Sequence, residues 1–134
     1  MRLADLRSDL IILACAISAG IHGALVPSHF DEGTGPGIGF AAATVALTGI
    51  VVWLTSRHAS VFALMAAAAT LAGLLASYAL AITTGVPVLH PHPEPVDGLA
   101  LATKAIEIVG LLAATSLLRR RVAVTHARPK GALT

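Results

Sequence analysis

The sequence predicts an all-α, membrane-embedded four-helix bundle with antiparallel, up-down topology. Its 134 residues are 56% hydrophobic and 12% charged, with a mean hydropathy of +0.83, whereas soluble domains carry about 25% charged residues. Four apolar stretches are each close to the roughly 20 residues that a helix needs to cross a bilayer. A closed barrel would need alternating apolar and polar residues, and these unbroken runs of Ala, Leu, Val and Ile lack that alternation. The predicted spans cover residues 10–27, 37–55, 60–84 and 97–118, between a cytoplasmic lead at 1–9 and a basic tail at 119–134.

Lysine and arginine residues gather at one end of the predicted bundle. Eight of the nine lie before the first span, in the link between the second and third spans, or after the fourth. The positive-inside rule therefore predicts that both termini are cytoplasmic. No basic face with aromatic or motif support accompanies these charges, so we expect the lipid bilayer, and no nucleic acid, as a partner. The eight residues are Arg2, Arg7, Arg57, Arg119, Arg120, Arg121, Arg128 and Lys130.

The first span carries a polar stripe. Cys15, Ser18 and His22, with His29 just beyond the span, fall within about 60° of arc on an ideal helix. For Cys15 and Ser18 we favour ordinary small-residue helix packing. An ionisable residue within a span is expected to face a partner or a cavity, which applies to His22.

The end of the first span is set by Pro27, which we expect to stop or kink the helix. The acidic and glycine-rich residues 28–36 are predicted to form a flexible external turn. In the second and third spans, small and hydroxyl residues recur at helical spacing, and we interpret them mainly as packing surfaces. They include Thr44, Thr48 and Thr55 in the second span and Thr70, Gly73, Ser77 and Thr84 in the third.

The second external link contains a run of alternating prolines, His90-Pro91-His92-Pro93-Glu94-Pro95. These prolines exclude a helix and favour an extended or polyproline-like chain. In an extended chain the two histidines and the glutamate would share one side. Imidazole and carboxylate groups suit Cu, Zn or Fe ions. The alternative is that the loop histidines are solvated and the acids complete the charge asymmetry. The candidate metal ligands are His22, His29, His90, His92 and Glu94.

The fourth span contains a candidate intramembrane polar site made of Asp97, Lys104 and Glu107. Asp97 is placed to cap the helix, and Lys104 lies within about 20° of it around the helix axis. Lys104 and Glu107 are separated by three residues and can pair directly. Buried carboxylates in membranes often titrate, which would suit ion or proton transport. The alternative is a neutralised pair that orients the helix toward a partner subunit.

Three segments resemble a family of small four-span integral membrane proteins of high-GC bacteria: Ile21-His22-Gly23-Ala24-Leu25-Val26-Pro27-Ser28-His29-Phe30, Glu94-Pro95-Val96-Asp97-Gly98-Leu99 and Thr103-Lys104-Ala105-Ile106-Glu107. Such sequences tend to read His-x-Ala-Leu-Val-Pro-Glu-His and Glu-Pro-Val-Asp-x-Leu-Gly-Leu-x-Thr-Lys-x-x-Glu. This chain has Ser28 where Glu is usual, which weakens any role for a carboxylate there. The resemblance implies four spans in a bacterial inner membrane and carries over no activity.

We therefore expect a small polytopic membrane protein with a histidine- and acid-rich extracytoplasmic face. The favoured function is an accessory or ligand-handling subunit that binds a transition metal. The alternatives are an ion or proton transport subunit working through Lys104 and Glu107, and a structural subunit that associates with itself or another membrane protein. No nucleophile with a base and oxyanion donors is recognisable, so the sequence does not favour an enzyme and names no catalytic residue.

Overall fold

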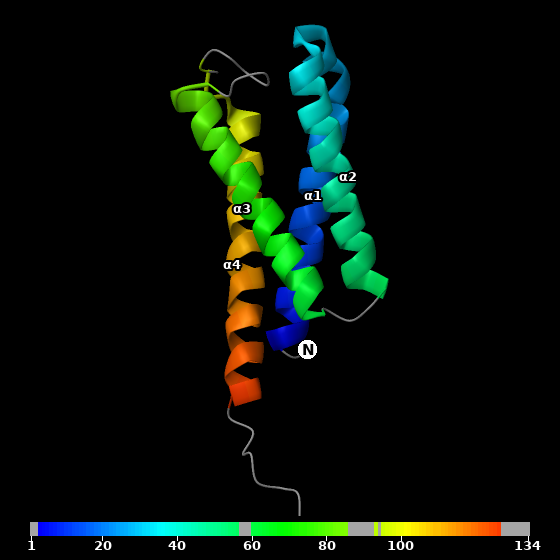
Figure 1. The fold of residues 1–134 in the computed structure, drawn as a ribbon, viewed down its shortest axis with the longest axis vertical. Helices are drawn as coiled ribbons and strands as arrows, with labels where there is room; N and C mark the ends of the chain where they lie inside the picture. The colour runs from blue at the N-terminus through cyan, green and yellow to red at the C-terminus, as the bar shows by residue number, and fades with distance from the viewer. Residues whose placement is uncertain (1–2, 57–59, 86–92, 94, 127–134) are drawn as a thin grey trace, which may run out of the picture.

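The computed structural model describes residues 3–56, 60–85, 93 and 95–126, and within them the protein is a bundle of four helices. The helices are α1 (Leu3–Glu32), α2 (Thr34–Ser56), α3 (Val61–Thr83) and α4 (Gly98–His126). Successive helices run antiparallel, so the start of α1, the connection from α2 to α3 and the end of α4 lie at the same end of the bundle (Figure 1). We call this the basic end, because Arg7 and Arg119 to Arg121 lie there. The predicted all-α four-helix fold is confirmed.

All four helices are long and apolar enough to cross a membrane. Large apolar side chains remain on their outer faces: Val45 is 72% exposed, Phe62 is 73% exposed and Leu112 is 63% exposed. A soluble monomer rarely exposes a large contiguous apolar surface, whereas lipid accommodates it. These features are those of a multi-pass membrane protein.

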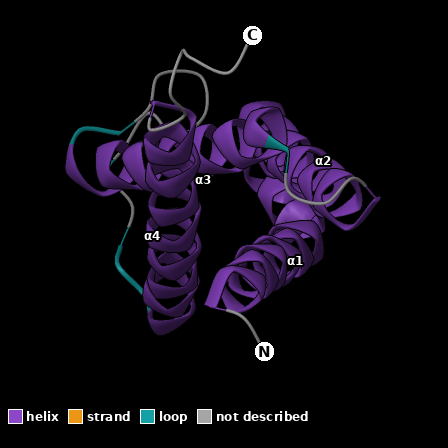
Figure 2. Cartoon of the chain, turned by 90° about the horizontal axis from the view of Figure 1, so that it is seen from below, coloured by secondary structure: helices purple, strands orange, loops and turns teal. Residues whose placement is uncertain are grey.

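The apolar core lies in the half of the bundle nearest the basic end. Each helix contributes to it from that half, including Ile11 of α1, Leu47 of α2, Leu64 of α3 and Leu117 of α4. The α1–α2 and α3–α4 pairs are in contact there, mainly through α1 and α4, and they diverge toward the opposite end (Figure 1, Figure 2). The candidate functional site lies where the two helix pairs separate.

We expected Pro27 to stop or kink the first helix, and the helix does not stop there but continues to Glu32. Proline removes one N–H donor from the helix ladder, but the turn around it is reinforced by two side chains. Ser28 Oγ donates to the carbonyl of Leu25 at 2.9 Å, and His29 Nδ1 lies 2.9 Å from the same oxygen. These contacts hold the last turns of α1 in helical form.

The expected flexible turn over residues 28–36 is also wrong, because a single residue, Gly33, separates α1 from α2. Its N–H donates to His29 O at 3.1 Å, and its carbonyl accepts from Gly37 N at 3.2 Å. Pro36 lies in the first turn of α2, where a missing N–H has no intrahelical partner to lose. Residues 28–36 are therefore helical except at Gly33.

The start of α4 agrees with the sequence-based expectation, and its end does not. Asp97 caps the helix: its Oδ1 accepts from Ala100 N at 2.7 Å, and its carbonyl accepts from Leu101 N at 3.1 Å. The helix then continues to His126 instead of giving way to a tail after Leu118. Arginine is a good helix former and its charge is favourable near a helix C-terminus, which accounts for the extension. Similarly, α1 begins at Leu3 and absorbs most of the expected lead.

The third helix matches its predicted bounds. Ser60 is the N-cap and its Oγ accepts from Ala63 N at 3.1 Å, while Thr84 is the C-cap. The chain leaves the helix through Gly85, whose φ of 74° is readily adopted only by glycine.

Candidate functional site

A buried ion pair lies on α4, and its carboxylate also contacts α1. Lys104 Nζ lies 2.7 Å from Glu107 Oε2, which confirms the pairing expected from their spacing. The Glu107 side chain is fully buried and that of Lys104 is 13% exposed. The second carboxylate oxygen of Glu107 accepts a hydrogen bond of 2.7 Å from Ser18 Oγ of α1. Both oxygens of this carboxylate are therefore satisfied, one by a cation and one by a hydroxyl.

The polar stripe of α1 is buried against the other helices. Cys15 and Ser18 have no exposed surface, and His22 is 7% exposed. We expected Ser18 to serve packing, but its hydroxyl is the contact between α1 and Glu107. The helical spacing of polar residues correctly placed Ser18 on the buried face of α1. It could not show that Glu107 of α4 lies opposite this residue.

His22 is oriented by its own helix. Its Nδ1 lies 2.9 Å from the carbonyl of Ser18 and 3.3 Å from the hydroxyl of the same residue. A carbonyl oxygen only accepts hydrogen bonds, so Nδ1 carries the hydrogen, and Nε2 of the neutral ring has a free lone pair. No residue that the structure describes donates to this Nε2.

Phe40 of α2 lies against the two histidines of α1, a contact that no sequence pattern predicted. The His29 ring stacks on the Phe40 ring with centroids 3.6 Å apart, and the His22 ring is tilted at 5.2 Å. His29 Nδ1 also faces a backbone carbonyl, that of Leu25. The two imidazoles thus share an aromatic neighbour although they lie two helical turns apart.

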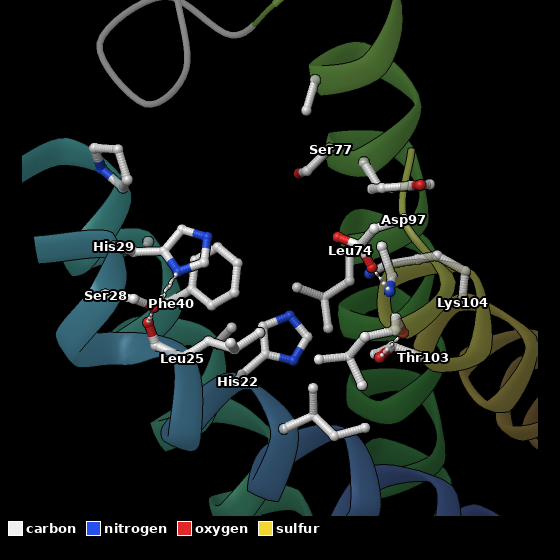
Figure 3. Close-up of a pocket in the computed structure, with 18 of the residues that line it drawn as sticks. His22, Leu25, Ser28, His29, Phe40, Leu74, Ser77, Asp97, Thr103 and Lys104 are labelled. Carbon is white, nitrogen blue, oxygen red and sulfur yellow. Dashed lines mark hydrogen bonds between the residues drawn. The ribbon is translucent and has the colours of Figure 1, made fainter. Parts of the chain in front are cut away.

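A cleft of about 710 Å³ opens where the helix pairs diverge. One wall comes from α1 and α2 and carries His22, His29 and Phe40; the opposite wall comes from α3, α4 and the segment before α4 (Figure 3). Apolar side chains make up much of the remaining lining, among them Ile21, Leu25, Leu74 and Leu99. The charged residues of the lining are Glu32, Asp97 and Lys104.

The packing role expected of the small and hydroxyl residues of α3 is wrong at two positions, Gly73 and Ser77. Ser77 lines the cleft and points toward the wall formed by α1 and α2 (Figure 3). A Cβ added at Gly73 would meet no atom within 4 Å. Tyr78, the next residue after Ser77, also lines the cleft, and Lys104 Nζ lies 5.4 Å from the centre of its ring. The ammonium therefore has a carboxylate on one side and an aromatic face nearby.

The proposed metal ligands are only partly covered by the structure. His22 and His29 both line the cleft, while His90, His92 and Glu94 lie outside the described residues. Within the described part of the chain, no group of three or more His, Cys, Asp or Glu side chains could hold a metal ion.

No protein-family model matches the chain, and comparisons with curated proteins and with solved structures likewise found no match.

Proposed function

We propose that this protein is a ligand-handling membrane subunit that binds a small ligand in the cleft between its helix pairs. The cleft itself carries the proposal. Its volume of about 710 Å³ lies in the range of small-molecule sites, roughly 300–1,000 Å³. Such sites are mostly apolar with a few placed polar groups, and the polar groups here include His22, Asp97 and Lys104. A purely structural bundle would have no need of a lined cavity with ionisable residues.

We propose that the cleft opens on the extracytoplasmic side of a bacterial inner membrane, with both termini cytoplasmic. The positive-inside rule supports this orientation, because the described arginines, Arg7 and Arg119 to Arg121, lie at the end opposite the cleft. Single cysteines introduced as Gly33→Cys and Arg57→Cys in a Cys15→Ala chain test it. A membrane-impermeant maleimide should label position 33 in intact cells and position 57 only after permeabilisation. Labelling of both positions from one side would contradict the orientation.

A transition metal ion, Cu, Zn or Fe, is the first candidate ligand. Histidine ligands of metals commonly donate their other ring N–H to a backbone carbonyl, which fixes the ring and leaves one nitrogen for the ion. In His22 and in His29 the Nδ1 atom faces such a carbonyl, and His29 Nε2 also lies 4.0 Å from Glu32 Oε2. Donors from His90, His92 and Glu94 would complete the set.

Metal analysis of the purified protein tests this candidate. We expect about one equivalent of metal in the unaltered chain and loss of most of it in His22→Ala and in the double variant His90→Ala/His92→Ala. The control is His58→Ala, which removes a histidine from the connection between α2 and α3. Well under one equivalent in the unaltered protein, or equal losses in the control, would rule out the metal.

Ion or proton transport is the second candidate, and the burial of Glu107 supports it. Carboxylates within membranes often take part in proton or ion pathways, and this one lies on α4 beside Lys104, which lines the cleft. A proteoliposome ion flux that is abolished by Glu107→Gln would favour transport over ligand handling. A chain with neither flux nor ligand would instead be a structural partner of itself or of another subunit.

A further inference from the structure

His22 is a buried residue whose second ring nitrogen, Nε2, has no hydrogen-bond partner among the described residues. The residue is 7% exposed, lines the cleft and projects from α1 between the two walls (Figure 3). Its Nδ1–H is taken by the Ser18 carbonyl at 2.9 Å. The Nε2 lone pair accepts no hydrogen bond from any described residue. Because this nitrogen belongs to a residue that lines the cleft and has no donor among the described residues, a ligand that offers an N–H or O–H group fits this position.

The charges of the cleft favour a cation. Glu32 and Asp97 contribute two carboxylates to the lining, and Lys104 contributes one ammonium. That ammonium is already matched at 2.7 Å by Glu107, which lies outside the lining. Of the two remaining carboxylates, that of Glu32 lies 4.0 Å from His29 Nε2. With neutral imidazoles, the described lining therefore carries an excess of negative charge, and a cleft lined by one sign of charge concentrates ions of the opposite sign.

The side chains of the cleft walls suit a ligand that carries an apolar group beside its positive charge. Phe40, with His29 stacked on it at 3.6 Å, forms an aromatic surface on one side. Leu74 and Leu99 lie among the lining residues of the other side. Aromatic faces attract cations as well as apolar groups, so the same surface suits both parts of such a ligand.

We propose that the cleft binds a protonated amine carried on an apolar body, with its N–H donating to His22 Nε2 and its charge facing Asp97. This rests on the proposed ligand-handling function and names the ligand class. A carboxylate or phosphate ligand would meet Asp97 and Glu32 with the same charge. A carbonyl-bearing ligand without a donor would leave His22 Nε2 unpaired.

Four probes that share one naphthalene ring separate these possibilities: 1-naphthylmethylamine, its N,N,N-trimethylammonium analogue, 1-naphthylmethanol and 1-naphthoate. Binding to the full chain in nanodiscs is measured by calorimetry, with empty nanodiscs correcting for uptake by lipid. We expect the primary amine to bind most tightly, the trimethylammonium ion and the alcohol ~10-fold more weakly, and the carboxylate not at all. Equal binding of all four would overturn the proposal, because it would show apolar uptake without selection for charge or a donor.

Two variants assign the roles of the residues. Asp97→Asn keeps a helix cap, since asparagine caps as well as aspartate, and should weaken both cations ~10-fold while leaving the alcohol unchanged. His22→Phe keeps an aromatic ring without Nε2 and should make the amine and the trimethylammonium ion bind equally. The control is Asp31→Asn, an acid on α1 that does not line the cleft, and it should change nothing. A loss of cation binding in this control equal to that in Asp97→Asn would contradict the assignment.

Zinc binding in the same nanodiscs distinguishes failure of the amine proposal from failure of the proposed ligand-handling function. If zinc binds at one equivalent and the amine does not, ligand handling stands and the amine class is wrong. If neither zinc nor any naphthyl probe binds, the cleft is not a ligand site and the proposed function fails with the inference.

Discussion

Replacing Glu107 with leucine is expected to lower the free energy of unfolding by about 3 kcal/mol, the larger of the two stability effects that we expect. The variant leaves Lys104, whose side chain is only 13% exposed, without the carboxylate that lies 2.7 Å from its ammonium. It also removes the acceptor of the Ser18 hydroxyl. An unpaired ammonium within a membrane is unfavourable by a similar amount.

The double variant Lys104→Met/Glu107→Leu is expected to regain most of this loss. Replacing a whole buried ion pair by apolar residues of similar volume is often neutral or stabilising, whereas removing one partner is not. The Ser18 hydroxyl can then turn back to a carbonyl of its own helix. The measurement is reversible unfolding in mixed micelles by addition of SDS, followed by circular dichroism. If the double variant is as unstable as Glu107→Leu, the damage comes from lost packing and not from the unpaired charge.

An isosteric variant separates the two contacts of the carboxylate. Glu107→Gln keeps an oxygen that can accept from Ser18 and replaces the charged oxygen that faces Lys104 with a neutral NH2 group. Its unfolding free energy should lie between those of the unaltered chain and Glu107→Leu. A value equal to that of the unaltered chain would mean that the ion pair contributes nothing and that the hydrogen bond to Ser18 holds α1 to α4.

The topology and the ion pair could be predicted from the sequence because both depend on local information. Apolar stretches of sufficient length, joined by short links, define an up-down bundle. Lys104 and Glu107 lie on one helix, where a separation of three residues determines their proximity. The cap at Asp97 follows from the same kind of local rule.

The contacts between helices could not be predicted, because they depend on how far one helix is shifted along another. The hydrogen bond from Ser18 to Glu107 joins residues 89 positions apart in the chain. The position of Phe40 against His22 and His29 depends in the same way on how α2 returns along α1. Helix ends were missed where several weak preferences act together, as at Pro27, where side chains that bond to the Leu25 carbonyl reinforce the turn.

One residue of α4, Gly110, sets the distance between α1 and α4. A Cβ added at this glycine would lie 2.7 Å from Ala14 Cβ and 3.1 Å from Leu71 Cδ1. The first distance is too short for two carbon atoms, so the helices would have to separate. Ala14 lies one turn before Ser18 on α1, and Gly110 lies one turn after Glu107 on α4. The spacing at Gly110 therefore determines whether the Ser18 hydroxyl can reach the Glu107 carboxylate.

Gly110→Ala is accordingly expected to destabilise the protein by about 2 kcal/mol, the usual effect of overpacking a tight contact. The matched control is Gly73→Ala, because a Cβ at Gly73 would meet nothing within 4 Å. Alanine is the better helix former, so this control should be neutral or slightly stabilising. Both are measured by SDS unfolding in mixed micelles. Equal losses in the two variants would mean that glycine serves helix flexibility and not the approach of α1 to α4.

A second substitution tests whether the contact itself is responsible. Ala14→Gly in the Gly110→Ala chain removes the atom at 2.7 Å and leaves only the end of the Leu71 side chain, which can rotate. Most of the lost stability should return, less about 1 kcal/mol for a glycine within α1. Cleft binding should follow the same order, because the carbonyl that orients His22 belongs to Ser18. A chain that regains stability but not ligand binding would show that the cleft depends on α1 in some way other than its distance from α4.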